Sequence, residues 1–200
     1  AGRDTTRLIL SWFLYEMCKR PEIKRKIYNE IDDFIEQNET TEMDYDKIGQ
    51  SLFYTESTLL ETLRLNPVVP FLIRHAMEDV KLPDGHIIRE RNEVVIPTYA
   101  FGRNPKIWKD PLKFDPNRFY GKDKDPVNVY SVYQYPFFNI NPRLCLGRKL
   151  ALMEAKVFLF YFCQEYDFEM ADPNQEIKIK TGIVLNMQEG LRLKLTKRVK

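Results

Sequence analysis

The stretch that decides the fold lies around residue 145 and reads Phe137-Phe138-Asn139-Ile140-Asn141-Pro142-Arg143-Leu144-Cys145-Leu146-Gly147-Arg148. Cys145 has no second cysteine or histidine close to it in the sequence. A cysteine in an all-protein metal site normally has other ligands a few residues away. A lone thiolate therefore indicates a metal whose other ligands are not protein. Haem iron fits, because the porphyrin supplies four nitrogens and the protein adds an axial ligand.

The residues around Cys145 support this interpretation. Cys145 directly precedes a predicted helix, where free N–H groups and the helix dipole stabilise a thiolate. Arg143 offers donors for a carboxylate such as a haem propionate, and Gly147 lets the backbone approach a flat ligand. The alternative is a buried structural cysteine, which is the commoner role of a lone Cys. The neighbouring residues Phe138, Arg143 and Gly147 favour the interpretation of Cys145 as a metal ligand.

Composition indicates an ordinary globular chain. Its 200 residues are about one domain long, and a net charge of +2 without a basic stripe excludes a typical nucleic-acid binder. The three cysteines are too few for a disulfide framework and fit a reducing compartment, so Cys18 and Cys163 are expected to be small buried thiols. The longest apolar run, Val157–Cys163, is too short for a membrane span. Because the chain starts at Ala1 without an initiator Met, we expect a fragment of a longer protein.

Hydrophobic periodicity predicts the elements. Apolar residues at helical spacing predict helices at Leu8–Lys19, Pro21–Ile35, Ser51–Leu65 and Leu146–Glu165, and a helical turn at Asp44–Gly49. Short strands are predicted at Leu72–Val80, Ile87–Ile88 and Val94–Ile96, and a hairpin at Glu176–Lys197. Between Asn104 and Asn128, prolines, charges and aromatics predict a packed loop. The predicted fold class is mainly α with small β-sheets.

A second motif is Glu61-Thr62-Leu63-Arg64, whose acid and base share one helix face. In most proteins such a pair lies on the surface and contributes about 0–1 kcal/mol. Here Arg118 follows within Phe114-Asp115-Pro116-Asn117-Arg118-Phe119 and could contact the same Glu61. A buried cluster of these three charges would lock the long loop against the helix and fix one geometry.

The third motif is Ala1-Gly2-Arg3-Asp4-Thr5-Thr6. Read alone, it is a helix cap. The functional alternative is an acid–alcohol pair, Asp4 and Thr5, within a longer helix that Gly2 and a threonine loosen locally, so that O2 and a proton-relay water can be held. His75 and His86 lack ligand-like neighbours and are expected to be structural or exposed.

Taken together and in this order, the three motifs resemble the C-terminal half of a cytochrome P-450 over essentially the whole chain. The resemblance implies the P-450 fold in its C-terminal portion, from the middle of the oxygen-binding helix to the C-terminus. Residues 1–200 would be part of a single domain. The Ala1-Gly2-Arg3-Asp4-Thr5-Thr6 version resembles eukaryotic fatty-acid and alkane ω-hydroxylases.

The resemblance also implies residue roles. Cys145 would be the axial ligand of the iron of haem b, Arg143 and Arg74 would contact its propionates, and Asp4 and Thr5 would serve dioxygen activation and proton delivery. Phe138 and Gly147 would also lie against the haem. Glu61, Arg64 and Arg118 would form a buried structural triad. The residues facing the substrate would be Ala1, Thr5, Val68, Val69, Ile183 and Val184.

The implied activity is monooxygenation of a lipophilic, fatty-acid- or alkane-like substrate. Electrons would come from NADPH through a flavoprotein cytochrome P-450 reductase, docked near Arg148 and Lys149. The full-length protein would lie on the cytoplasmic face of the endoplasmic reticulum membrane. Two alternatives are a reductase-independent peroxide isomerase or dehydratase, against which the Asp4–Thr5 pair argues, and a non-catalytic truncated fragment with exposed apolar surface.

One position departs from the family pattern. Where the family usually has glycine in the cysteine loop, this chain has Asn141. Asn tolerates the left-handed backbone region better than other side chains after glycine. We therefore expect the loop to keep its turn, with Asn141 in that conformation.

Overall fold

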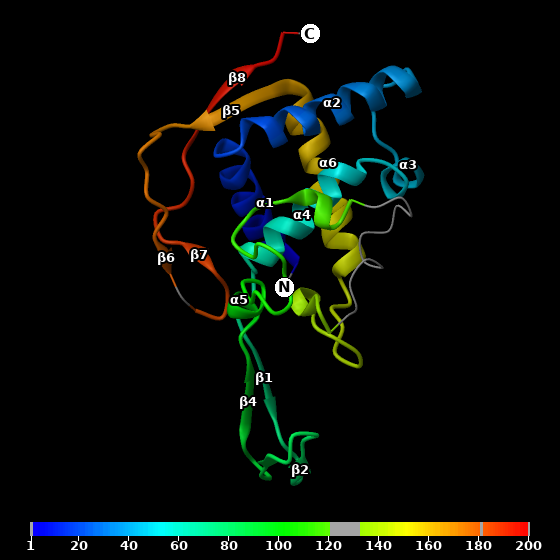
Figure 1. Ribbon diagram of the computed structural model, residues 1–200. Helices are drawn as coiled ribbons and strands as arrows, with labels where there is room; N and C mark the ends of the chain where they lie inside the picture. Colours follow the sequence, from blue (N-terminus) through cyan, green and yellow to red (C-terminus); the bar gives the residue numbers. More distant parts are fainter. Residues whose placement is uncertain (1, 121–132, 181, 200) are drawn as a thin grey trace.

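Helices form the body of the molecule, and a long double hairpin extends from it (Figure 1). The computed structural model describes residues 2–120, 133–180 and 182–199. Its helices are α1 (Gly2–Cys18), α2 (Pro21–Asn38), α3 (Tyr45–Gly49), α4 (Phe53–Leu65), α5 (Thr98–Phe101) and α6 (Arg148–Glu165), with 3-10 turns at Pro116–Arg118 and Pro136–Phe138. The prediction of a mainly α fold with small sheets is confirmed.

Helix α4 lies at the centre and contacts α1, α2 and α6. Nearly all of its residues are buried, including hydroxyl side chains. Thr58 and Thr62 satisfy their hydroxyls by donating to the backbone carbonyls one turn earlier, at 2.8 Å each. The free N–H groups at its start are capped from α2, where the Glu30 carboxylate accepts from Tyr54 N at 2.6 Å and Thr55 N at 2.9 Å.

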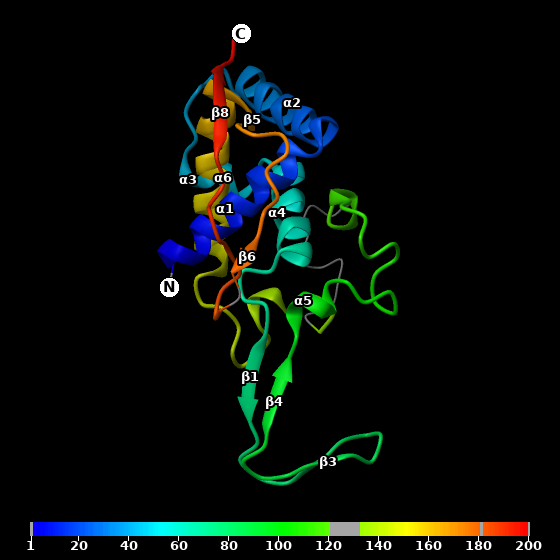
Figure 2. The same ribbon diagram turned by 90° about the vertical axis from the view of Figure 1, so that its left-hand side faces the viewer.

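Two small antiparallel sheets form the double hairpin, which projects away from the helices (Figure 2). Strand β1 (Leu72–His75) pairs with β4 (Glu93–Ile96), with Leu72 opposite Ile96, and β2 (Val80–Lys81) pairs with β3 (Ile87–Ile88). The predicted strand Leu72–Val80 is therefore interrupted between β1 and β2. His75 and His86 are exposed on this hairpin.

The C-terminal strands pair differently from the prediction. Only β6 (Ile179–Lys180) and β7 (Asn186–Met187) form a local hairpin. Strand β8 (Leu193–Lys197) instead pairs with β5 (Tyr166–Met170), which directly follows α6. The predicted single hairpin over Glu176–Lys197 is wrong in this respect, because alternation shows that a segment is a strand but not which strand it joins.

The helix boundaries bear on the site. Helix α1 begins at Gly2, well before the predicted Leu8, so Asp4 and Thr5 lie inside a helix and do not cap one. Helix α6 begins at Arg148, just beyond Cys145. The loop after Asn104 is irregular apart from one 3-10 turn, and its predicted end, residues 121–128, lies outside the described residues. Nowhere in the described ranges does a helix have the length and apolar character needed to cross a membrane.

Candidate functional site

The loop that carries Cys145 is folded by its own backbone. The Cys145 N–H donates to Phe138 O at 2.8 Å, and the Arg143 N–H donates to Ile140 O at 2.8 Å. These bonds place the cysteine beside Phe138, directly ahead of α6. Cys145 is exposed, whereas Cys163 is buried and Cys18 is half-buried. The expected burial of the other two thiols is thus complete for Cys163 and partial for Cys18.

An apolar cavity of about 230 Å³ lies between α1, the end of α4, β1 and the cysteine loop. It brings together six residues singled out from the sequence, namely Thr5, Val68, Val69, Phe138, Arg143 and Cys145. Its other walls come from residues that were given no individual role from the sequence, namely Thr6, Ile9, Leu63, Leu72, Phe137, Asn139, Ala151 and Leu152. The lining combines a thiol, a hydroxyl and a guanidinium within apolar walls.

Other predicted positions lie around this cavity. Asp4 is exposed on α1. Ile183 is also exposed, while Val184 packs against the core, and the next N–H, of Leu185, donates to Val68 O at 2.9 Å. The segment before β7 is thus attached at the cavity's edge. Ala1 lies outside the described residues.

Gly147 precedes α6 with an ordinary φ of −85°. A Cβ added there would have no described protein atom within 4 Å. No packing within the described chain therefore requires glycine at this position, and there is space beside it for a ligand.

Arg74 reaches the cysteine loop from strand β1. Its guanidinium donates to the Asn139 side-chain oxygen at 2.6 Å and to Ile73 O at 2.8 Å. Asn139 was not singled out from the sequence, and no sequence signal marks it. The expected left-handed conformation at Asn141 is wrong, because the positive φ of this loop, 67°, belongs to Asn139. Asn141 precedes Pro142, and the residue before a proline is restricted to extended backbone.

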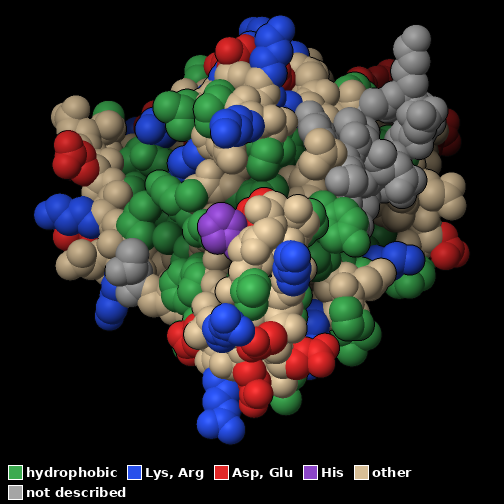
Figure 3. All heavy atoms as spheres, turned by 60° about the horizontal axis from the view of Figure 1, so that its bottom comes forward, with side chains coloured by type: hydrophobic (Ala, Val, Ile, Leu, Met, Phe, Trp, Pro, Cys, Tyr) green, Lys and Arg blue, Asp and Glu red, His purple; other side chains and the backbone are tan. Residues whose placement is uncertain are grey.

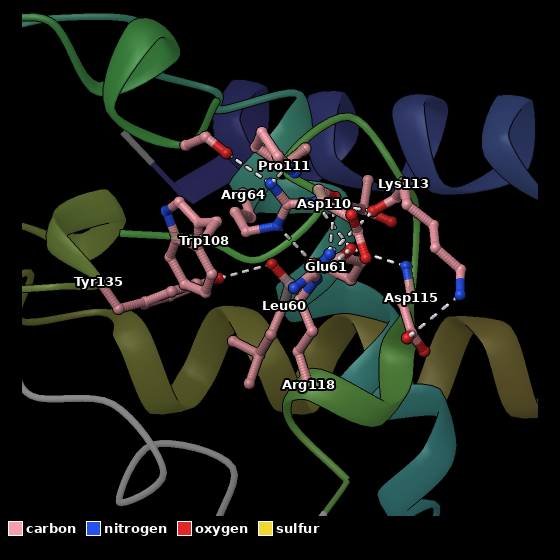
Figure 4. Close-up of polar contacts among 12 residues, drawn as sticks. Leu60, Glu61, Arg64, Trp108, Asp110, Pro111, Lys113, Asp115, Arg118 and Tyr135 are labelled. Carbon is pink, nitrogen blue, oxygen red and sulfur yellow. Dashed lines mark hydrogen bonds and ion pairs between the residues drawn. The ribbon is translucent and has the colours of Figure 1, made fainter. Parts of the chain in front are cut away.

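Glu61 lies between two arginines (Figure 4). Arg64 donates to both of its carboxylate oxygens, at 2.6 and 2.8 Å, and both side chains are fully buried. Arg118 Nε lies 3.4 Å from Glu61 Oε1, and the Asp115 N–H donates to the same oxygen at 2.7 Å. Burial raises the pKa of Glu61, while the hydrogen bonds from Arg64 and Asp115 oppose that rise.

This cluster holds the long loop after α5. Arg64 donates to the carbonyls of Gly102, Pro111 and Lys113, the last two at 2.7 and 3.1 Å. Gly102 approaches α4 so closely that an added Cβ would lie 2.0 Å from Arg64 O. Arg64 thus supplies the hydrogen-bond donors that backbone N–H groups would give these carbonyls in a helix or a sheet.

Tyr135 connects the cysteine loop to the same helix. Its hydroxyl donates to Leu60 O at 2.7 Å (Figure 4). Its ring lies edge-on to Phe119 and Phe137, with centroids 5.1 and 4.7 Å away. Burial raises its pKa, so it acts as a neutral donor. Tyr135 was not predicted from the sequence, where its only signal is the aromatic run Tyr135-Pro136-Phe137-Phe138.

A second hollow, of about 710 Å³, lies on the other side of the cysteine loop and also includes Cys145. The ion pair Lys156–Glu56, 2.9 Å long, lines it together with Leu146 and Lys149. Lys149 is exposed, and the Arg148 guanidinium lies 5.5 Å from the centre of the Phe138 ring.

Within the part of the chain that the structure describes, no group of three or more His, Cys, Asp or Glu side chains could hold a metal ion. An exposed cysteine before a helix, beside an apolar cavity with arginines at its edge, is typical of the haem-thiolate class of proteins. The family model described as Cytochrome P450 matches residues 1–195, and the chain belongs to this family. Membership implies a haem cofactor.

Curated relatives agree with this assignment. The chain is 32% identical over 200 residues to "Alkane hydroxylase MAH1" of Arabidopsis thaliana, covering 100% of this chain and 38% of the relative. It is 34% identical over 196 residues to "Cytochrome P450 4F8" of Homo sapiens, covering 97% and 36%. It is 38% identical over 177 residues to "Cytochrome P450 monooxygenase cyp1" of Mycosarcoma maydis, covering 86% and 28%. The chain thus spans little more than a third of these relatives at most.

Proposed function

We propose that the protein is a haem-thiolate monooxygenase that inserts one oxygen atom of O2 into a lipophilic, fatty-acid- or alkane-like substrate. The observation that carries this proposal is that Thr5 and Cys145, which are far apart in the sequence, line one cavity. A thiolate ligand on haem iron favours O–O cleavage, and a positioned hydroxyl can deliver a proton to bound oxygen.

The residues present fit haem b. Cys145 would supply the thiolate ligand, Phe138 and the apolar lining would contact the cofactor, and Gly147 would leave room for it. Arg143 and Arg74 would bind its carboxylates, since guanidinium groups match carboxylate geometry. When bound, haem supplies the iron that activates dioxygen.

The chain's own groups would act on the proton and the thiolate. Cys145 would offer its sulfur as the ligand, three residues before α6 begins at Arg148. The Thr5 hydroxyl lies 3.5 Å from Gly2 O and can hold a proton at the cavity wall. Exposed Asp4, its neighbour, would exchange that proton with solvent. Glu61, Arg64 and Arg118 would keep the supporting loop in place.

An aliphatic substrate is supported by the lining and by one relative. Val68 and Val69 present apolar side chains to the cavity, and Ile183 and Val184 lie on the segment attached beside Val68. The relative named alkane hydroxylase matches the whole chain. We also propose that Ala1 contacts the substrate, because the resemblance to the family implies this role.

The electron donor would be a flavoprotein reductase fed by NADPH. Exposed Lys149, close to Cys145, would attract an acidic surface of that partner. We propose residues 1–200 as the C-terminal part of a single P-450 domain, located on the cytoplasmic face of the endoplasmic reticulum membrane. Substrate turnover that depends on NADPH and reductase supports this proposal, whereas turnover of a peroxide without them indicates the isomerase or dehydratase alternative.

The test of the proposal is Cys145→Ser in the intact protein. We expect loss of the thiolate-type absorption of the reduced carbon monoxide complex, because an alcohol is a poor anionic ligand. Cys18→Ser, at a half-buried thiol on α1, is the matched control and should retain that absorption. A thiolate signature that survives Cys145→Ser would refute the assignment.

A further inference from the structure

Asn139 has a backbone conformation that side chains rarely adopt. Its φ of 67° and ψ of −178° lie in a region that is essentially restricted to glycine. A residue persists there only when its surroundings hold it, and such residues cluster at functional sites. The Asn139 N–H closes the 3-10 turn by donating to Pro136 O at 2.9 Å.

In this conformation the Asn139 side chain makes two hydrogen bonds. Its Oδ1 accepts from Arg74 Nη2 at 2.6 Å and from the Ile140 N–H at 3.0 Å. One oxygen thus connects strand β1 to the cysteine loop, at a residue that lines the cavity with Arg143 and Cys145.

The partners of Arg74 are electrically neutral. They are the Asn139 amide oxygen and the Ile73 carbonyl. Within the described ranges no carboxylate forms an ion pair with Arg74; the nearby Glu93 lies 3.9 Å from His75 instead. The guanidinium is therefore held in position while its charge stays uncompensated, which favours the binding of an external carboxylate.

We propose that Asn139 is a positioning residue that presents the charged Arg74 guanidinium to a carboxylate of the bound cofactor. This inference rests on the proposed function and identifies the carboxylate as a haem propionate. Asn is suited to the task because its side-chain oxygen accepts a hydrogen bond without neutralising the arginine.

The test compares two variants of the haem-loaded intact protein. Asn139→Asp keeps the acceptor but adds a charge that pairs with Arg74. We expect haem release to an apomyoglobin acceptor to be roughly tenfold faster, the scale of one charged hydrogen bond. Asn139→Gly suits the backbone but removes the acceptor, so release should accelerate while the urea midpoint is unchanged or higher. A merely structural Asn139 would give slower or unchanged release in Asn139→Gly.

Haem dimethyl ester, which lacks both carboxylates, serves as the second probe. We expect Asn139→Asp and the wild type to release it at the same rate. Asn174→Asp adds the same charge on the exposed turn after β5 and should not change release of either probe.

Equal effects on haem and its ester would overturn the inference, as would unchanged haem release in Asn139→Asp. Weaker binding of dodecanoic acid with unchanged haem release would assign Arg74 to a substrate carboxylate and overturn it too. A thiolate spectrum that survives Cys145→Ser would instead refute the proposed function, so the two failures can be told apart.

Discussion

Cys145 differs from the other two cysteines in exposure. It is exposed in the cysteine loop, whereas burial raises the pKa of Cys163 to about 12 and that of Cys18 to about 11. Only a thiolate reacts readily with alkylating reagents. The same exposure that makes Cys145 available to iron should therefore make it the most reactive thiol.

We predict that iodoacetamide at about pH 8 modifies Cys145 first in haem-free protein. A raised pKa keeps Cys163 and Cys18 almost fully protonated at that pH, so their rates should be at least about tenfold lower. Mass spectrometry of peptides after short exposure measures the order. Prior loading with haem should protect Cys145 and leave the other two unchanged; preferential labelling of Cys163 would contradict the prediction.

Thr5 is the residue on the other wall of the cavity. In the intact protein, we predict that Thr5→Ala lowers product formed per NADPH consumed by about tenfold or more, because a positioned proton donor is lost. Ser11→Ala removes a hydroxyl that donates to Arg7 O at 2.9 Å on the same helix, and serves as the control. Unchanged coupling in Thr5→Ala would exclude the proton role.

At the scale of elements, α4 holds together the parts of the chain that build the site. Arg64 binds carbonyls along the loop after α5, and Leu60 accepts from Tyr135 at the entry to the cysteine loop. The irregular segments are thus positioned by a buried helix.

We predict that Glu61→Gln destabilises the protein by about 3–5 kcal/mol, because it leaves Arg64 buried with an uncompensated charge. Urea unfolding with a fixed m-value measures this difference. Glu169→Gln is the control, since Glu169 and Lys194 form an exposed pair between β5 and β8, and its cost should be within about 1 kcal/mol. A similar loss of stability in both variants would mean that the buried Glu61 cluster stabilises the protein no more than an exposed ion pair does.

At the scale of the whole molecule, apolar side chains remain on the surface. Seen from the hairpin end, hydrophobic patches surround a protruding region that carries charged side chains (Figure 3). On and just before α6, Leu146, Leu150 and Phe158 are exposed. Exposed apolar patches mark sites that contact other protein segments, membranes or ligands.

We predict that the 200-residue chain, expressed by itself, binds haem only weakly, with a dissociation constant of roughly micromolar or weaker. Cys145, Arg143 and Leu146 are all exposed to water. Water therefore competes with haem for the thiol and the guanidinium. Titration of haem followed by its Soret absorption measures the affinity. Tight stoichiometric binding would show that these residues suffice for a haem site.

Local sequence was enough for the four main helices and for a hypothesis about the site, but it did not indicate strand β5 (Tyr166–Met170) or the start of α1 at Gly2. Helical periodicity predicted the four main helices, and the isolation of Cys145 between Arg143 and Gly147 pointed to a haem ligand. These properties depend on neighbours within a few residues, which the sequence displays directly.

Tertiary structure alone decided which distant segments meet. The pairing of β8 with β5, the support of the cysteine loop by Tyr135 and the contact of Arg74 with Asn139 leave no local pattern. The positive φ was expected at Asn141 but occurs at Asn139, because Pro142 restricts Asn141 and Arg74 holds Asn139. Periodicity reports which face of a segment is buried, but the partner on that face is chosen by packing across the whole chain.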